Sequence, residues 1–153
     1  MKALIIFDSV YGNTEKIARA IASGMSAKAV RPEEVKPEDM QGLNILVVGS
    51  PTHGGRATPE LQKVLNDIPA NGLKNVKVTA FDTRISGKDR GFGVRMITKA
   101  FGYAAGRIAK MLEEKGGTVV LEPQGFIVDN NEGPLKAGEI ERATDWGKEI
   151  AAK

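Results

Sequence analysis

The chain contains no cysteine, and its 153 residues include a single histidine. Without cysteine it forms no disulfide, no iron–sulfur cluster, no thiolate metal site and no cysteine nucleophile. The lone histidine, His53, has no second imidazole or thiolate with which to share a metal ion, so we expect no metal site. A G-x-S-x-G motif is also missing, which argues against a serine hydrolase.

Long hydrophobic runs are absent as well. No apolar run approaches the roughly 18 residues that cross a bilayer, and the N-terminus leads into a strand pattern rather than a secretion signal. We therefore expect a cytoplasmic protein. Aromatic residues make up 5% of the chain and the formal net charge is +3. Because no basic stripe rich in aromatic residues is present, we expect no nucleic-acid partner.

What the chain does contain is an alternation of strand and helix patterns, in a length that fits one domain over residues 1–153. The expected strands are residues 3–7, 27–31, 44–49, 76–81, and 118–121 resumed at 126–128. The expected helices are residues 14–25, 59–68, 104–114, and a final helix with Ile140, Ala143, Gly147 and Ile150 on its inner face and Trp146 alongside. This alternation predicts an α/β fold: a five-stranded, doubly wound parallel sheet in three layers.

Three loops follow the carboxyl ends of the expected strands, where ligands bind in such sheets: residues 8–14, 50–57 and 82–101. The first loop ends at the start of a helix, where backbone N–H groups lack internal partners and the helix dipole favours an anion. Its hydroxyl and amide side chains add further donors, so the loop is a candidate phosphate site. The alternative is that Asn13 or Thr14 only caps the helix.

Two of these loops resemble the flavodoxin family. The segment Ser9-Val10-Tyr11-Gly12-Asn13-Thr14 fits the family's [ST]-x-T-G-N-T phosphate loop, with tyrosine in place of threonine at Tyr11. Residues 49–54 follow the family's G-[SC]-x-T-aromatic-G form, with His53 in the aromatic position. Residues 126–143 resemble the closing segment of the family, so the likeness runs along nearly the whole chain.

The resemblance implies the strand order 2-1-3-4-5 and an FMN cofactor at the point where that order reverses. The FMN phosphate would lie in residues 9–14, and the isoalloxazine ring between residues 51–55 and the loop that begins at residue 82. Gly54 would let its peptide turn a carbonyl toward the flavin N5. The implied cofactor-binding residues are Ser9, Val10, Tyr11, Gly12, Asn13, Thr14, Pro51, Thr52, His53, Gly54, Gly55, Asp82, Thr83 and Arg84, with no catalytic residue.

The sequence departs from the family pattern in its charge. Flavodoxins are acidic around the flavin, whereas His53, Arg56 and Arg84 would surround the ring here. Positive charge stabilises the reduced, anionic flavin, so we expect a less negative hydroquinone potential than in an acidic flavodoxin. The third loop also lacks the tyrosine that usually stacks on the ring, and Phe92 is the candidate to replace it.

The segment of residues 84–99 carries five basic residues and one acidic one: Arg84, Lys88, Arg90, Arg95 and Lys99 against Asp89. Such a segment suits docking of an acidic redox partner protein. Contact with an anionic membrane surface is a weaker alternative.

The expected function is electron transfer between redox partners by an FMN-binding carrier. One alternative is a flavodoxin-like FMN oxidoreductase with its own substrate, of the quinone or protoporphyrinogen type. The other is a flavodoxin-like module that has lost the flavin and serves in protein interaction. A phosphoryl-accepting receiver domain does not fit, because Ser50 and Pro51 stand where it needs an acid. A dinucleotide-binding domain would need G-x-G-x-x-G after the first strand.

Overall fold

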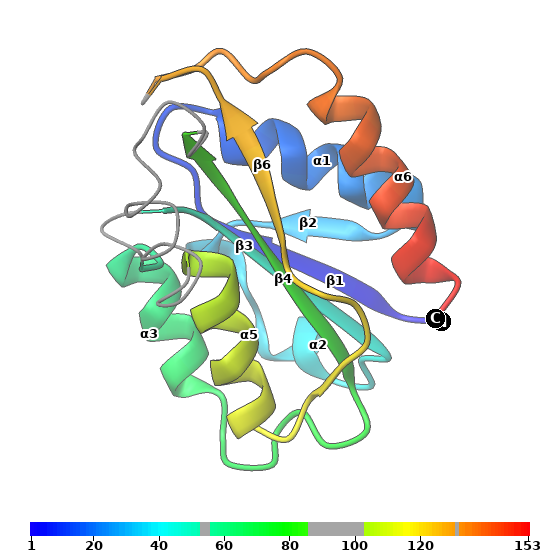
Figure 1. The fold of residues 1–153 in the computed structure, drawn as a ribbon. Helices are drawn as coiled ribbons and strands as arrows, with labels where there is room; N and C mark the ends of the chain where they lie inside the picture. Colours follow the sequence, from blue (N-terminus) through cyan, green and yellow to red (C-terminus); the bar gives the residue numbers. More distant parts are fainter. Residues whose placement is uncertain (53–55, 86–102, 131) are drawn as a thin grey trace.

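The computed structural model describes residues 1–52, 56–85, 103–130 and 132–153. In these residues a parallel sheet has the strand order β2-β1-β3-β4-β5, with β6 also paired to β4 (Figure 1). The strands are β1 Ala3–Phe7, β2 Lys28–Val30, β3 Ile45–Pro51, β4 Lys77–Ile85, β5 Thr118–Val119 and β6 Gln124–Val128. The helices are α1 Asn13–Met25, the 3-10 turn η1 Pro32–Glu34, α2 Pro37–Met40, α3 Pro59–Asp67, α5 Ala104–Glu114 and α6 Glu139–Ala151. The predicted fold class and strand order are confirmed.

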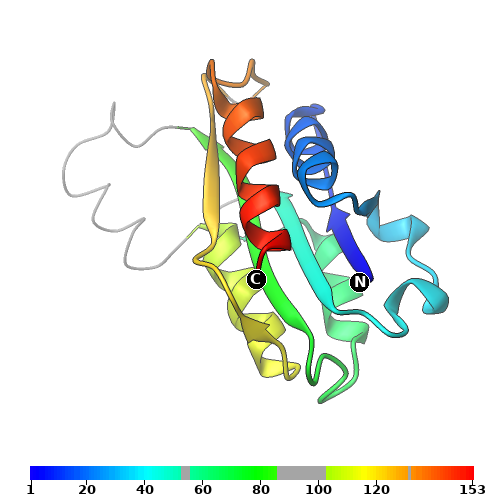
Figure 2. The ribbon, with the colours of Figure 1, turned by 90° about the vertical axis from the view of Figure 1, so that its right-hand side faces the viewer.

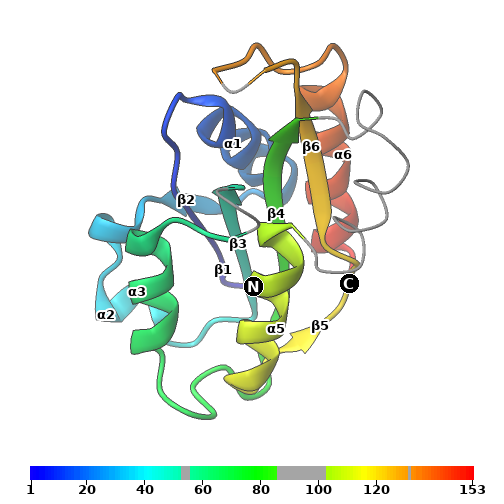
Figure 3. The ribbon, with the colours of Figure 1, turned by 60° about the vertical axis from the view of Figure 1, so that its left-hand side comes forward.

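The fifth position of the sheet is divided between two strands. Figure 3 shows β5 and β6 beside β4, one following the other along it. The break near Pro123 was predicted, but β6 resumes at Gln124 rather than at residue 126. Gly125 pairs with Asp82 in this strand, and the guanidinium of Arg84 packs against its backbone, where a Cβ would collide with that group.

Each face of the sheet buries its own hydrophobic core, and the central strands supply both. In β1, Leu4 and Ile6 pack toward α3 and α5, while Ile5 and Phe7 pack toward α1 and α6. All of these side chains are buried. Continuous apolar strands are what a parallel sheet covered on both faces requires.

Helices α1 and α6 lie side by side on one face (Figure 2). Gly24 and Gly147 allow the close approach, since a Cβ on either would fall on a backbone carbonyl of the facing helix. Trp146 packs edge-on against Phe81 and Phe126, with ring centroids 6.4 and 6.0 Å away. Trp146, expected alongside the inner face of the last helix, is thus buried in the core.

One prediction for the last helix is wrong. Ile140 was expected on the inner face, but 38% of it is exposed. Glu139 takes the buried place in the first turn, so the inner stripe begins one residue earlier than the apolar pattern indicated.

Glu139 and its neighbours also cover the outer edge of β6. The Glu139 carboxylate accepts the N–H of Ile127 at 2.7 Å, and Arg142 donates to the carbonyl of Gly125 at 2.6 Å. The N–H of Lys136 donates to the Ile127 carbonyl at 2.9 Å. A hydrogen bond from Arg142 is the main reason that the pKa of Glu139 is lowered. Three backbone groups that face away from β4, the N–H and carbonyl of Ile127 and the carbonyl of Gly125, are thus bonded within the chain.

Candidate functional site

The carboxyl ends of β1, β3 and β4 meet at one edge of the sheet, as predicted (Figure 1). The pairing register sets Phe7 beside Gly49, and Ser50 beside Asp82. The three candidate loops therefore leave the sheet from adjacent positions. This is the place at which ligands bind in doubly wound folds.

The first loop is shaped by Ser9 and Gly12. The Ser9 hydroxyl accepts the N–H of Gly12 at 3.0 Å and the N–H of Glu15 at 3.3 Å. Gly12 has a φ of +93°, a conformation that residues with a side chain rarely adopt. Ser9 thus bonds N–H groups at the start of α1 and leaves its own hydroxyl proton to donate.

Asn13 and Thr14 are not caps, because both lie inside α1. The Asn13 side chain donates to the carbonyl of Glu132 at 3.0 Å, and Thr14 shares a hydrogen bond of 2.7 Å with Thr83. Both residues are buried. The capping alternative is therefore replaced by two contacts that tie the first loop to neighbouring segments.

The backbone of this loop presents N–H groups at a helix N-terminus. No residue in the described part of the chain accepts a hydrogen bond from the N–H of Val10, Tyr11, Asn13 or Thr14. The side chains of Val10 and Tyr11 are exposed. Neutral N–H donors at the positive end of a helix dipole, beside a hydroxyl, fit a phosphate group.

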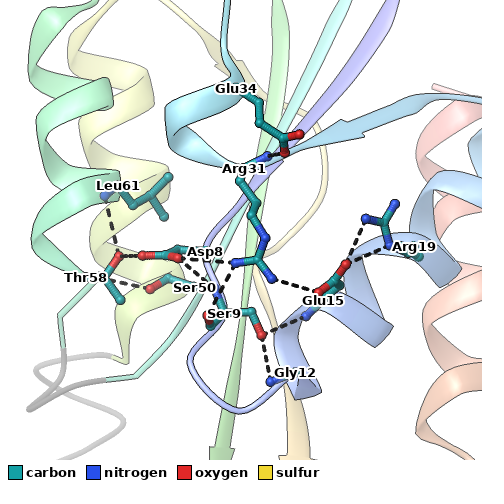
Figure 4. A network of polar contacts seen from close by, with 10 residues as sticks. All are labelled: Asp8, Ser9, Gly12, Glu15, Arg19, Arg31, Glu34, Ser50, Thr58 and Leu61. Atoms are coloured by element: carbon teal, nitrogen blue, oxygen red, sulfur yellow. Dashed lines mark hydrogen bonds and ion pairs between the residues drawn. The ribbon is translucent and has the colours of Figure 1, made fainter.

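A layer of charged residues lies behind the loop (Figure 4). The Asp8 carboxylate accepts the N–H of Ser9 at 2.8 Å and the hydroxyl of Thr58 at 2.5 Å. Arg31 donates to the carboxylate of Glu15 at 2.8 Å and to the carbonyl of Ser9 at 3.4 Å. Hydrogen bonds from Arg19, then the charge of Arg31, hold the pKa of Glu15 below its ordinary value.

The sequence analysis predicted the loop that holds Asp8, but it predicted no role for the charged residues that contact this loop. Their contacts depend on the pairing of β2 with β1, which brings Arg31 beside the first loop. The only sequence signal for the position of Arg31 was the predicted strand at residues 27–31, which ends before Pro32.

The second loop is anchored at both ends of its described part. The N–H of Thr52 donates to the carbonyl of Thr83 at 3.1 Å, which extends the pairing of β3 with β4 beyond Pro51. Thr58 caps α3 by accepting the N–H of Leu61. His53, Gly54 and Gly55 lie outside the described residues, so their contacts with a flavin ring stay predictions.

The third group, at the end of β4, divides between the two faces of the sheet. Thr83 points toward α1, where it meets Thr14. Asp82 points toward α5 and is fully buried, accepting the N–H of Ala105 at 2.9 Å. Burial raises the pKa of Asp82, while the hydrogen bonds and charge of Arg84 oppose that rise.

Asp82 and Tyr103 both hold the side chain of Arg84. Its Nε lies 2.6 Å from Asp82 Oδ1, and its guanidinium carbon lies 3.6 Å from the centre of the Tyr103 ring. Because Asp82 compensates its charge, the pair adds no net positive charge to the site. Arg56 is exposed, and His53 lies outside the described residues, so the expected positive rim stays a prediction.

Most of the other residues that were given a role in the third loop lie outside the described residues: Phe92 and the basic residues from 88 to 99. Within residues 1–52, 56–85, 103–130 and 132–153, no cluster of acidic and histidine residues has the arrangement of a metal site. In the same residues no helix combines the length and apolar character needed to cross a bilayer.

Comparison with known proteins places this arrangement in context. Residues 5–150 match the family model described as Flavodoxin. Diflavin flavoprotein A 2 of Thermosynechococcus vestitus is 38% identical over 80 residues, which cover 46% of this chain but only 14% of that protein. An uncharacterised protein of Methanocaldococcus jannaschii is 32% identical over 75 residues, covering 48% of this chain and 50% of that one.

Solved structures share the fold along nearly the whole chain. A flavodoxin from the domain Archaea has a TM-score of 0.76 at 20% identity, covering 99% of this chain and 97% of that one. Oxidised Flavodoxin 1 from Bacillus cereus has a TM-score of 0.75 at 19% identity, covering 99% and 98%. At such identities the likeness establishes the architecture alone.

Proposed function

The chain belongs to the flavodoxin family and is a flavin-binding redox protein with FMN as its cofactor, and we propose that it carries electrons between partner proteins. In this proposal residues 1–153 form one FMN-binding domain with no catalytic residue of its own. FMN supplies the one- and two-electron chemistry when bound, and the protein controls orientation, access and potential.

The observation that carries the proposal is the donor set of the first loop. Residues 9–14 would hold the FMN phosphate through the backbone N–H groups of Val10, Tyr11, Asn13 and Thr14 and through the Ser9 hydroxyl. All of these donors are neutral, and their N–H groups stand at the start of α1, where the helix dipole favours an anion.

The ring end of the proposed site comprises Pro51, Thr52, His53, Gly54 and Gly55 together with Asp82, Thr83 and Arg84. Thr83 ties this end to the phosphate loop through its hydrogen bond with Thr14. Asp82 bonds the N–H of Ala105 and so fixes the start of α5 beside the site. These contacts would hold the walls of the ring site in place.

The partner is proposed from charge and from the relatives. The basic segment at residues 84–99 suits an acidic redox protein, which would dock near the ring. The chain aligns to only 14% of the diflavin flavoprotein that it resembles, in a protein whose name indicates a second flavin. A flavoprotein reductase is therefore the partner class that we propose to supply electrons.

The test is the colour and the anaerobic reduction of the purified chain. A yellow protein that NADPH reduces only when a flavoprotein reductase is added supports the carrier. Reduction by NADPH alone, with turnover of a quinone, would show the FMN oxidoreductase instead. A colourless chain that does not quench the fluorescence of added FMN would overturn flavin binding.

A further inference from the structure

Arg31 extends to the candidate phosphate loop from the end of a different strand, and contacts outside that loop hold it in place. It directly follows β2, and its N–H donates to the carboxylate of Glu34 at 2.8 Å. The N–H of Glu34 donates back to the carbonyl of Arg31 at 3.0 Å. The guanidinium carbon lies 5.3 Å from the centre of the Phe7 ring. A planar guanidinium held in this way loses little further freedom when it bonds the loop.

The guanidinium bridges three acceptors of the first loop and helix (Figure 4). Its Nη2 lies 2.8 Å from Glu15 Oε1, and its Nη1 lies 3.4 Å from the Ser9 carbonyl and 3.9 Å from Asp8 Oδ1. Two carboxylates thus flank the loop that would receive a phosphate. Without a cation beside them, their charge would disfavour a second anion at that place.

The contact with the Ser9 carbonyl also sets a direction. In a trans peptide the carbonyl and the following N–H point to opposite sides. Since the Ser9 carbonyl points to Arg31, the N–H of Val10 points away from it. In the described part of the chain nothing accepts that N–H, so it is free to donate to a ligand on the far side of the loop.

We propose that Arg31 is a positioning residue that makes this site select flavins with a terminal phosphate over riboflavin. This inference rests on the proposed binding of FMN in the first loop. Arg31 would act without touching the phosphate: it compensates Asp8 and Glu15 and aims the N–H of Val10. Its loss should therefore weaken binding of the phosphate and leave binding of the ring nearly unchanged.

Arg19 supplies a matched control within the same network. It bonds the other oxygen of Glu15 at 2.8 Å, and its guanidinium carbon lies 5.7 Å from the Phe7 ring. Its side chain is 60% exposed, against 32% for Arg31. Within the described residues it bonds neither Asp8 nor the Ser9 carbonyl. Removing either arginine changes the net charge equally, so an effect specific to Arg31 cannot come from the net charge.

The experiment compares Arg31→Met with Arg19→Met in the full chain. Methionine keeps an unbranched stem over Phe7 while removing the guanidinium. Flavin is removed from each protein, which is then titrated with FMN and with riboflavin while flavin fluorescence is followed. We expect Arg31→Met to weaken FMN binding about tenfold to a hundredfold, as for loss of a charged hydrogen-bond partner. Riboflavin binding should change less than about threefold, and Arg19→Met should leave both affinities within about threefold.

The outcomes distinguish a failure of the role proposed for Arg31 from a failure of the proposed FMN binding. Equal weakening of FMN and riboflavin by Arg31→Met would overturn the role of Arg31, since it would indicate general damage to the site. Equal weakening of FMN by both variants would overturn it too, because charge alone would then explain the effect. Failure of the unaltered chain to bind either flavin would overturn the proposed function, and this inference with it.

Discussion

The two ends of the candidate flavin site handle charge in opposite ways. At the phosphate end the ion pairs stand behind the loop and are partly open to solvent, with Glu15 29% and Arg31 32% exposed. At the ring end the carboxylate of Asp82 is fully buried and depends on Arg84. Exposed pairs contribute little to folding, whereas a buried charge without its partner is costly. The phosphate end is thus open to tuning, while the ring end tolerates little change.

The largest effect is expected from breaking the pair at the ring end. Arg84→Met leaves the buried carboxylate of Asp82 without its cation and should lower the free energy of unfolding by about 3 to 5 kcal/mol. Denaturant unfolding measures the loss, and Arg56→Met, at an exposed position of the same site, should cost less than about 0.5 kcal/mol. A loss below about 1 kcal/mol for Arg84→Met would show that the two ends do not differ in this way.

A smaller effect is expected from the hydrogen bond that joins the two ends, between Thr14 and Thr83. Thr14→Val and Thr83→Val should each cost about 1 to 3 kcal/mol, because each leaves a buried hydroxyl unpaired. The double variant should cost less than the sum, since neither hydroxyl then remains. Denaturant unfolding of all four proteins tests this, and strictly additive losses would mean that the bond does not couple the ends.

The smallest effect is expected from the pH dependence of the phosphate end. The pKa of Glu15 is lowered in the folded chain, so its ion pairs add stability above the ordinary value of 4.5. That stability is lost as the pH falls through the lowered pKa. Because the pairs are exposed, the contribution is about 0.5 kcal/mol. The free energy of unfolding of Glu15→Gln should therefore decline less between pH 7 and pH 3 than that of the unaltered chain. Parallel plots of this free energy against pH would contradict the role given to the Glu15 ion pairs.

The elements could be located from local patterns, but some of their bounds and side-chain directions could not. Apolar periodicity located the helix at residues 104–114 to the residue. It ended the strand before it at residue 81, whereas β4 continues to Ile85. Asp82, Thr83 and Arg84, which follow Phe81 in β4, are polar, so hydrophobicity alone stops too early. Ile140 was misplaced for a related reason, since a bonded glutamate took the buried position.

The motif of the candidate phosphate loop could be recognised in the sequence, but the charged residues that contact the loop could not. The order of residues in Ser9 to Thr14 is a local motif at a strand end, and the family match supports it. The contacts of Arg31 join residues far apart in the sequence and depend on the register of β2 against β1. The pairing of Arg84 with Asp82 was missed because arginine is usually a surface residue. Nothing in the sequence shows that Asp82 is buried, and only that burial makes Arg84 recognisable as its partner.

The covered outer edge of β6 has a consequence for how this protein meets others. A strand from another chain can pair with a free strand edge and extend the sheet. Such pairing gives complexes that exchange partners slowly and, between copies of one chain, fibres. Here residues 134–142 of the same chain occupy the hydrogen-bonding groups of that edge. Complexes at this side must then form between side chains. Encounters between charged side chains respond to ionic strength, which is the behaviour expected under the proposed electron-carrier function.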